Sequence, residues 1–410
     1  MTNQEKNVPE LRFPEFDGEW QEKKLGDIAI IKGRLGWKGL KNEEYVENGY
    51  AYLVAGRHIK NGIIDWHSAD QINKFRYDES PEISLEKNDI IFSKDGSLGN
   101  PAIIQSMLKP ATINGTMMLV RVQAQKLNPN FFYQILLNDH FKRLIHLKVS
   151  GSSIPHLFQA DMKEFTIKTT KINEQQKIGE FFSKLDRQIE LEEQKLAKLE
   201  EQKKGYMQKI FSQELRFKDK NGNEYPKWEV IKLKDILSER KEYASKIGNY
   251  PHATLSTSGI SLKSDRYNRD FLVKDKNKKY KVTIMNDICY NPANLKFGVI
   301  TRNHIGSVIF SPIYITFEVN NAHSPLFIEL LVTRNDFINR VRKYEEGTVY
   351  ERMAVKPEDF LNYETKIPCL EEQEKIGDFF SKLDKVINKQ RQKIDELKLL
   401  KQGLLQKMFV

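Results

Sequence analysis

Residues 174–211 read EQQKIGEFFSKLDRQIELEEQKLAKLEEQKKGYMQKIF, and residues 372–409 read EQEKIGDFFSKLDKVINKQRQKIDELKLLKQGLLQKMF. The two stretches align without a gap, 198 positions apart, and share 20 of 38 residues. An internal repeat of this kind fixes the architecture before any local motif does. It indicates two half-molecules in one chain, each a globular segment followed by a long helix. The function must therefore be one that uses two of something.

The repeat continues outside the helices. The motif Glu-Leu-Arg-Phe at 10–13 recurs at 214–217, and Asn-Asp-Ile at 88–90 recurs at 286–288. Between such anchors the halves differ, and their short alternating apolar runs predict mainly antiparallel strands. We predict an α+β fold, with two tandem mixed α/β domains joined by two long helices. The predicted parts are an N-terminal segment (1–19), a first domain (20–171), a central helix (172–213), a second domain (214–370) and a C-terminal helix (371–410).

The order of these motifs is circular: it is the order that a closed ring of two repeats would have if it were opened at one point. The first helix runs directly into Glu-Leu-Arg-Phe, whereas the second helix ends at the last residues and its counterpart motif stands at 10–13. We therefore expect the termini to be neighbours and a pseudo-two-fold axis to relate the halves.

Both helices keep a seven-residue apolar pattern, which predicts a coiled coil. Polar residues break the pattern at the same two places in each copy, Glu192 and Lys203, then Gln390 and Lys401. A parallel pair would put Lys203 beside Lys401, whereas an antiparallel pair can put Glu192 opposite Lys401 and Lys203 opposite Gln390. We predict the antiparallel form; the alternative is two helices that each pack on their own domain. The predicted seam comprises Ile178, Phe182, Leu185, Ile189, Glu192, Leu196, Leu199, Lys203, Ile376, Phe380, Leu383, Ile387, Gln390, Ile394, Leu397 and Lys401.

The bulk properties favour a polyanionic partner. The 410 residues carry a formal net charge of +10 and a sequence pI of about 9.1, and nucleic acid is the usual partner of such a chain. A basic protein without such a partner is the open alternative. Cys289 and Cys369 form neither a disulfide framework nor a zinc motif, so we expect a reducing compartment and no metal site. No signal peptide and no membrane span is predicted.

No catalytic residue is predicted. The sequence has no GxxxxGK[ST] phosphate loop and no Gly-rich cofactor loop, so we expect no ATP motor and no cofactor in this chain. Residues 289–294 superficially resemble the Asn-Pro-Pro-aromatic motif of amino-methyltransferases but lack its second proline and its aromatic residue. The pair Glu364 and Lys366 is half of a nuclease motif, without a convincing Pro-Asp partner.

Contacts to nucleic acid are the better hypothesis. A dense basic run from 266 to 281 suits phosphate contacts, which position a protein without reading sequence. Arginine and short polar side chains in loops after probable strands can reach base edges. The alternative for each residue is a solvated loop or a role in holding the loop, above all for Asp95, Gly96 and Asn291. The predicted DNA-binding residues are Arg57, His58, Lys60, Lys94, Ser97, Arg266, Arg269, Lys274, Lys276, Lys278, Asn291, Asn294, Lys296 and Arg302.

Three motifs carry a resemblance to a known family. The pattern EQxxIxxFFxxLD occurs at 174–186 and 372–384, SGSSIPHL occurs at 150–157, and NDIIFSKDG at 88–96 is similar to the GDI-(L/V)-x-(S/T)-R-D-G stretch of target-recognition domains. Together they resemble the specificity subunit of type I restriction-modification systems, over essentially the whole chain. The second domain departs from the pattern, with Asn291-Pro292 in place of a Lys-Asp-Gly run, so we expect it to belong to a different specificity class.

The resemblance implies a non-catalytic subunit with two target-recognition domains and two helical regions. It implies double-stranded DNA as the ligand, with an asymmetric bipartite target and a nonspecific spacer. Two modification subunits would methylate adenine with S-adenosylmethionine after base flipping, and restriction subunits would use ATP and Mg. A helix of 38 residues is about 57 Å long, so the antiparallel pair would act as a ruler between half-sites. We expect a cytoplasmic protein of a bacterium or archaeon. The alternative is a coiled-coil scaffold that binds protein partners only.

Overall fold

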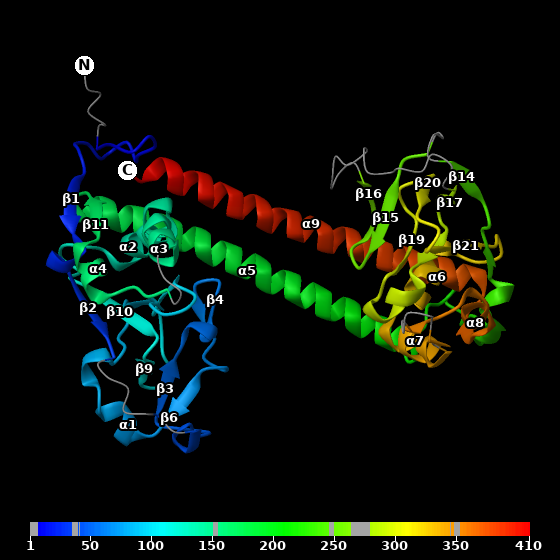
Figure 1. Cartoon of the computed structure of the whole chain (residues 1–410), viewed down its shortest axis with the longest axis horizontal. Helices are drawn as coiled ribbons and strands as arrows, with labels where there is room; N and C mark the ends of the chain where they lie inside the picture. The colour runs from blue at the N-terminus through cyan, green and yellow to red at the C-terminus, as the bar shows by residue number, and fades with distance from the viewer. Residues whose placement is uncertain are drawn as a thin grey trace. The chain divides into compact units, whose positions relative to one another are not determined.

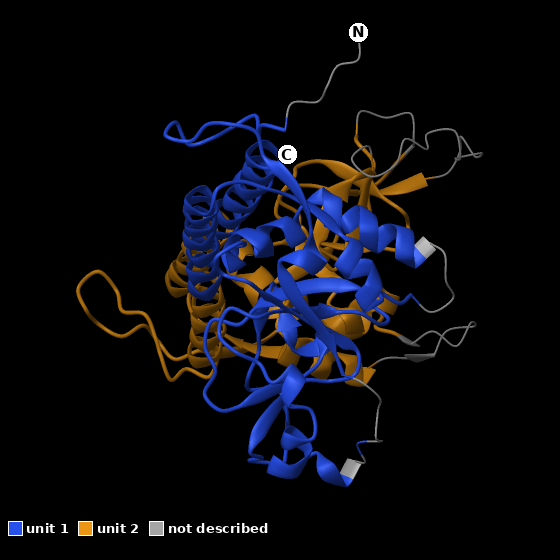
Figure 2. Cartoon of the chain, turned by 90° about the vertical axis from the view of Figure 1, so that its left-hand side faces the viewer, with its two compact units in different colours: residues 1–195, 390–410 blue, residues 196–389 orange. Residues whose placement is uncertain are grey.

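The computed structural model forms two compact units, one of residues 1–195 with 390–410 and one of residues 196–389 (Figure 2). Each unit therefore takes a part of both long helices. No helix in the described part of the chain is long and apolar enough to cross a membrane. The described residues are 7–34, 40, 42–150, 155–245, 250–263, 279–344, 346–347 and 353–410.

The first unit is built on a four-stranded antiparallel sheet. Its order is β2 (Ala29–Gly33), β10 (Met117–Val122), β7 (Ile90–Ser93) and β8 (Gly99–Ile103). Alternate side chains of β7 and β10 pack against helices on one face and against a second sheet on the other. Because both faces are covered, the strands can be apolar at every position rather than at alternate ones.

Further elements of the first unit surround this sheet (Figure 1). One two-stranded ladder joins the start of the unit to its end, and the second sheet contains one parallel pair, β3 with β9. These elements are β1 (Gln21–Lys24) with β11 (Thr166–Thr169), β6 (Asp70–Ile72) with β3 (Ala51–Val54) and β9 (Ala111–Ile113), β4 (Ile59–Lys60) with β5 (Ile63–Ile64), η1 (Leu25–Asp27), η2 (Asn42–Glu44), η3 (Gly56–His58), η4 (Pro81–Ile83), α1 (Lys74–Asp78), α2 (Pro129–Leu137), α3 (Asp139–Ser150) and α4 (Gln159–Glu164).

The second unit repeats the topology of the main sheet. Its order is β13 (Leu237–Glu239), β21 (Ile315–Val319), β18 (Ile288–Tyr290) and β19 (Ile300–Arg302), all antiparallel. Its remaining elements are η5 (Leu233–Asp235), η8 (Pro292–Phe297), η9 (Arg342–Tyr344), β12 (Glu229–Lys232) with β24 (Glu364–Ile367), β14 (Tyr243–Ser245) with β17 (Lys279–Thr283) and β20 (Val308–Phe310), β15 (Ala253–Ser256) with β16 (Gly259–Leu262), β22 (Glu346–Gly347) with β23 (Met353–Ala354), α6 (Pro325–Val332), α7 (Asn335–Val341) and α8 (Pro357–Asn362). The mixed α/β organisation expected for both halves is therefore confirmed, and the two share more topology than sequence.

The two long helices are α5 (Ile172–Phe211) and α9 (Leu370–Met408), close to the predicted bounds. None of the sixteen predicted seam residues is exposed. Nine are buried and seven are half-buried. The buried ones are Ile178, Phe182, Leu185, Ile189, Ile376, Phe380, Ile387, Gln390 and Ile394; the half-buried ones are Glu192, Leu196, Leu199, Lys203, Leu383, Leu397 and Lys401.

The helix segments run antiparallel within each unit, as predicted. In the first unit Lys401 Nζ lies 2.5 Å from Asp186 Oδ1, and in the second Lys203 Nζ lies 2.5 Å from Asp384 Oδ1. These two ion pairs occupy equivalent positions of the repeat, because 186 and 384, like 203 and 401, are 198 apart. Chain direction reverses in the first unit, because Glu192, later in α5 than Asp186, is bonded to Gln390, earlier in α9 than Lys401. It reverses in the second unit as well, because the ring of Tyr206, later than Lys203, contacts that of Phe379, earlier than Asp384.

The predicted register is wrong. Glu192 accepts a hydrogen bond of 2.7 Å from Gln390 Nε2 and pairs with Lys393, not with Lys401. The reason is that each seam lysine finds an aspartate one position beyond the seam, Asp186 for Lys401 and Asp384 for Lys203. The predicted register would have left Lys203 opposite a neutral glutamine, whereas the observed one gives both lysines a counter-charge. The hydrogen bond from Lys393, followed by that from Gln390, lowers the pKa of Glu192.

The duplicated Glu-Gln pair at the start of each long helix fastens it to the rest of its unit. Glu174 is fully buried and accepts two hydrogen bonds of 2.7 Å from the Arg12 guanidinium. Glu372 is likewise buried and accepts bonds of 3.2 and 2.5 Å from Arg216. The Glu-Leu-Arg-Phe motif therefore exists in two copies because each helix needs its arginine.

Gln175 extends this fastening to helix α2. It accepts from the backbone N–H of Asn128, the N-cap residue of α2, at 2.9 Å, and Gln373 accepts from Ser324, the N-cap of α6, at 3.0 Å. The adjacent Gly179 comes so close to the start of α2 that an added Cβ would lie 2.9 Å from the Phe131 nitrogen. The repeated helix motif is thus a set of docking contacts onto the domain.

The N-terminal segment packs on the end of α9, as the ring-like order of motifs predicts. The Leu11 N–H donates to the Lys407 carbonyl at 2.8 Å, and Phe409 contacts Trp20 with ring centroids 6.0 Å apart. In the second unit Leu215 and Phe211 make the equivalent contacts, to Lys209 at 3.1 Å and to Trp228 at 5.9 Å.

Candidate nucleic-acid interface

The turn that leads into the third strand of each main sheet is built in the same way. Asn88 and Asn286 adopt the left-handed conformation, with φ of 73° and 75°, which asparagine tolerates better than other non-glycine residues. Asn thus stands where the related motif has Gly. The following aspartates are buried, Asp89 1% and Asp287 2% exposed, and each binds an arginine. These turns aim the strand toward the candidate loop.

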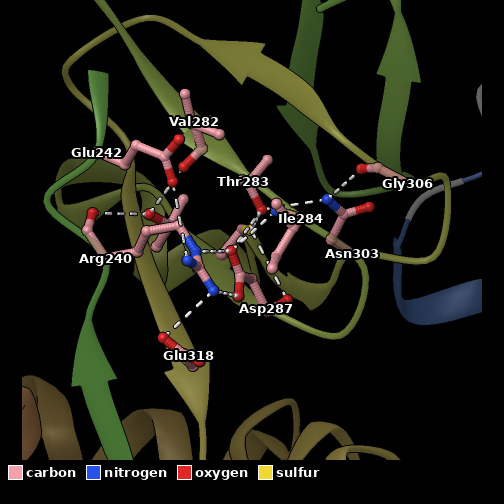
Figure 3. A network of polar contacts seen from close by, with 11 residues as sticks. Arg240, Glu242, Val282, Thr283, Ile284, Asp287, Asn303, Gly306 and Glu318 are labelled. Atoms are coloured by element: carbon pink, nitrogen blue, oxygen red, sulfur yellow. Dashed lines mark hydrogen bonds and ion pairs between the residues drawn. The ribbon is translucent and has the colours of Figure 1, made fainter. Parts of the chain in front are cut away.

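The arginines come from different strands in the two units. Asp89 accepts two bonds of 2.7 Å from Arg121 of β10. Asp287 accepts bonds of 2.8 and 3.0 Å from Arg240, which follows β13, and Thr283 and the Ile284 N–H also donate to it (Figure 3). The hydrogen bond that Arg240 donates to Asp287 raises the pKa of Arg240. Both units therefore keep a buried aspartate after the turn, but the arginine that binds it comes from a different place in each unit.

In the first unit the loop after β7 meets the segment after α3. The Leu157 N–H donates to the Lys94 carbonyl at 2.9 Å, and the Gly96 N–H donates to the Pro155 carbonyl at 3.2 Å. Asp95 pairs with both Lys94, at 2.7 Å, and His156. The SKDG motif and residues 155–157, about 60 residues apart in sequence, therefore contact each other.

Of the residues predicted there, Ser97 is exposed and free to contact a ligand, whereas Lys94 is half-buried and tied to Asp95. His156 and Phe158 were not predicted. Phe158 is 59% exposed and its ring centroid lies 4.2 Å from that of His156. The SIPHL motif was the sequence signal for this pair.

Arg57 and Lys60 lie on the surface of the first unit, each beside a carboxylate. Arg57 pairs with Asp70, and Lys60 Nζ lies 2.8 Å from Asp65, whose pKa this hydrogen bond lowers to about 2. His58, however, is only 2% exposed, and its Nδ1 accepts from the Ala55 N–H at 3.0 Å. The prediction that His58 faces a DNA groove is therefore wrong. Its side chain is buried and holds the η3 turn through the hydrogen bond from Ala55.

In the second unit the loop after β18 is the helix η8. Asn294 and Lys296 are exposed, and Lys296 Nζ lies 5.0 Å from the ring centroid of Phe297, itself 63% exposed. The exposed Phe297 was not predicted; an aromatic residue beside Lys296 was its only sequence signal. The Val355 N–H donates to the Pro292 carbonyl at 3.4 Å, so here too a segment from after the α6–α7 pair meets the loop.

Two other residues predicted in this unit hold the structure. Asn291 is buried and caps η8, accepting from the Ala293 N–H at 3.2 Å, which is the loop-holding alternative. Arg302 is half-buried, with its Nε 3.0 Å from Glu329 and its Nη1 donating to Asn286 at 2.8 Å. Neither side chain is free for a base edge in this conformation. Burial raises the pKa of the neighbouring Cys289 thiol, which opposes thiolate chemistry there.

Most of the predicted basic run lies outside the described residues. At its end, Lys281 belongs to β17 and is 1% exposed, with its Nζ 2.5 Å from Glu239. This lysine is a buried ion-pair partner rather than a phosphate contact. The predicted residues outside the described part are Arg266, Arg269, Lys274, Lys276 and Lys278.

Comparisons with known proteins point to one family. The family model described as type I restriction modification DNA specificity domain matches residues 17–201. The MjaVIII specificity subunit of a type I restriction enzyme from Methanocaldococcus jannaschii is 23% identical over 98% of this chain and 93% of its own length.

Solved structures show the same fold. An S subunit of a type I restriction-modification system from M. genitalium superposes with a TM-score of 0.62 at 16% identity, covering 98% of this chain and 99% of that one. A chain from a structure on assembly and conformational transition of the type I system gives 0.52 at 16% identity, covering 95% and 97%. With its two units of one topology and its duplicated helix, the chain resembles the DNA specificity subunits of type I restriction-modification systems over its length, and residues 17–201 match their specificity domain.

Proposed function

We propose that this chain reads an asymmetric bipartite DNA target, one half with each unit, for a complex in which two modification subunits methylate adenine. S-adenosylmethionine, ATP and Mg would be bound by the modification and restriction subunits, and this chain would supply recognition without catalysis. Such a complex would work in the cytoplasm of a bacterium or archaeon.

The observation that carries this proposal is a common frame with different loops. The sheet order, the buried Arg–Glu pair and the helix contacts recur in both units. The loop after the third strand does not recur, because it is an extended loop at 94–98 in one unit and the helix η8 in the other. A repeat that keeps its frame and varies its loops suits two readers of different sequences.

The exposed residues of these loops would make the base contacts. Ser97 and Asn294 are short polar side chains that can reach base edges, and Lys296 next to Phe297 offers a cation and an aromatic face. Arg57 and Lys60 would serve as phosphate contacts, exchanging their present carboxylates for the backbone.

Sequencing of methylated bases in cells with and without this chain tests the proposal. We expect a bipartite adenine-methylated motif that disappears with the chain. Asn294→Ala with Lys296→Ala should relax one half of the motif only, Ser97→Ala the other half only, and the exposed Lys234→Ala should leave both unchanged. Methylation that is the same without the chain would contradict the proposal.

The ruler role has its own test. A four-residue insertion beside Lys198 adds about 6 Å of helix, so we expect a longer spacer in the methylated motif. An unchanged spacer would contradict the ruler. A footprint of the complex that protects no DNA would instead favour a scaffold that binds proteins only.

A further inference from the structure

Each unit exposes a phenylalanine in the loops that follow the third strand of its main sheet. Phe158 is 59% exposed in the first unit and Phe297 is 63% exposed in the second. Single exposed apolar residues are common on protein surfaces, but these two stand at the same place in both units. The loops that carry them are called here the first loop pair, residues 94–98 with 155–158, and the second loop pair, residues 291–299 with 353–356.

The two phenylalanines do not descend from one position of the repeat. Phe158 is the N-cap residue of α4, and its counterpart at the N-cap of α8 is Lys356. Phe297 stands before a glycine with φ of 76°, and its counterpart before a glycine with φ of 88° is the half-buried Leu98. The exposed ring is therefore supplied from opposite sides of the loop pair in the two units. Kinship between the halves does not explain it, and a shared use does.

Both rings project from backbone that is held in place. The Phe158 N–H donates to Asp161 Oδ2 at 2.9 Å, which caps α4. In the second unit the Gly298 N–H donates to the Leu295 carbonyl at 2.8 Å, which closes η8 directly after Phe297. Leu295 itself is fully buried. A fixed backbone leaves little conformational entropy to lose on binding, so each ring is arranged in advance for a ligand.

Each ring has a polar neighbour that supports it. The His156 ring lies 4.2 Å from that of Phe158 between centroids and is itself paired with Asp95. Lys296 Nζ lies 5.0 Å from the centroid of Phe297. A cation directly beside an exposed aromatic ring suits a ligand that has flat apolar faces next to phosphates, which is the chemistry of a stacked nucleic acid.

We propose that Phe158 and Phe297 act as wedges, each inserting between two neighbouring base pairs of its half-site so that the pairs unstack and the duplex kinks. This inference rests on the proposed function, which supplies the DNA. A phenylalanine has no hydrogen-bonding group for a base edge, but a base step offers it two flat faces, and apolar wedges kink duplexes by about 20–90°. A protein partner would need a wider apolar patch, whereas exposed members of these loops such as Ser97 and Asn294 are polar.

The wedges add a second kind of selectivity to each half-site. The free energy needed to unstack a step depends on its sequence and is lowest at flexible pyrimidine–purine steps. A wedge therefore favours half-sites that contain such a step, without any contact to a base edge. An unstacked step also lowers the cost of turning a neighbouring adenine out of the duplex for methylation.

Binding and bending of duplexes that carry the methylated motif test the proposal. The full chain is assembled with its modification subunits, and fluorophores on either side of one half-site report its bend by energy transfer. We expect Phe158→Ala to straighten one half-site and Phe297→Ala the other, each with roughly 5- to 100-fold weaker binding, the effect of losing one stacked aromatic ring. Phe75→Ala in α1 and Val230→Ala in β12, 71% and 63% exposed, are matched controls that should bind and bend like the wild type.

Two further measurements separate a wedge from a residue that only holds its loop. Replacing either phenylalanine by leucine should keep most of the bend, because leucine also serves as a wedge. A nick moved step by step through the half-site weakens stacking at one step without changing a base, so a nick at the wedged step should restore the binding of the alanine variant.

The possible outcomes divide cleanly. Alanine variants that bind and bend like the wild type would overturn the inference and leave the proposed function intact. A loss of binding that neither leucine nor any nick restores would assign the rings to loop packing and overturn it as well. A wild-type complex that does not bind the duplex would overturn the inference together with the proposed function.

Discussion

Removing Arg216 should unfasten the start of α9 from its unit. Arg216 makes two hydrogen bonds to the Glu372 carboxylate and donates a third, of 2.7 Å, to the Pro226 carbonyl. The Glu372 side chain is 1% exposed, whereas that of Arg216 is 20% exposed. Arg216→Met therefore leaves the Glu372 carboxylate in the interior without its counter-charge. Removing one partner of a buried ion pair costs more free energy than replacing both partners by apolar residues.

The expected cost is about 3 kcal/mol, the lower end of the range for breaking a buried ion pair, because Arg216 keeps some contact with water. Hydrogen exchange followed by mass spectrometry measures it locally, and about 3 kcal/mol corresponds to roughly 100-fold faster exchange in peptides that cover β12 and the first turns of α9. Lys407→Ala is the control, because its pair with Glu10 is exposed on both sides and contributes about 0–1 kcal/mol.

The double variant Arg216→Met with Glu372→Met decides whether the charge is the cause. Two apolar side chains of similar volume leave no buried charge, so we expect the double variant to exchange more slowly than Arg216→Met alone. The reasoning is refuted if Arg216→Met exchanges like the wild type, or if the double variant loses the sum of the two single losses.

Three further predictions follow from individual contacts. Asp186→Lys places two cations together and should lower the stability of the helix pair by about 1 kcal/mol, and adding Lys401→Asp should restore it in thermal melts; failure of the swap to rescue would contradict the observed register. Burial lowers the pKa of His58, so the unfolded chain binds more protons than the folded one below about pH 6.5; the local stability of residues 51–72 should fall as pH drops through that value, and a pH dependence that persists in His58→Gln would exclude this histidine as its source. Asn291→Ala removes the cap of η8 and should cost about 1 kcal/mol, seen as faster exchange of its loop with no change in the sheet.

The sequence is most predictive where contacts are periodic. The heptad pattern gave both long helices and a seam without an exposed member, because a buried stripe needs apolar residues at fixed spacing. The antiparallel direction followed from like charges at Lys203 and Lys401. The register did not, because the aspartates that neutralise them, Asp186 and Asp384, stand just outside the stripe and carry no periodic signal.

The candidate site was less predictable because its contacts are not local. The polar residues beside His58 predict an exposed side chain, yet its ring is 2% exposed and accepts a hydrogen bond from the backbone N–H of Ala55. Lys281 continues a run of lysines but is buried by Glu239, 42 residues earlier. Whether a charged side chain faces solvent depends on which strands pair. A single sequence predicts that pairing only at the few motifs that recur in both halves.

The duplicated helix also has a genetic consequence. A crossover between the coding stretches for 174–211 and 372–409 deletes 198 codons in frame and leaves a chain of 212 residues, since 410 less 198 is 212. That product keeps a Glu-Leu-Arg-Phe motif, one main sheet and one long helix. The helix retains an aspartate at the position of Asp186 and a lysine at the position of Lys401, the two residues that pair in the full chain. A single helix cannot pair antiparallel with itself, so the shortened chain would complete its seam with a second copy. One recombination event would thus turn a reader of two different half-sites into a symmetric reader of one.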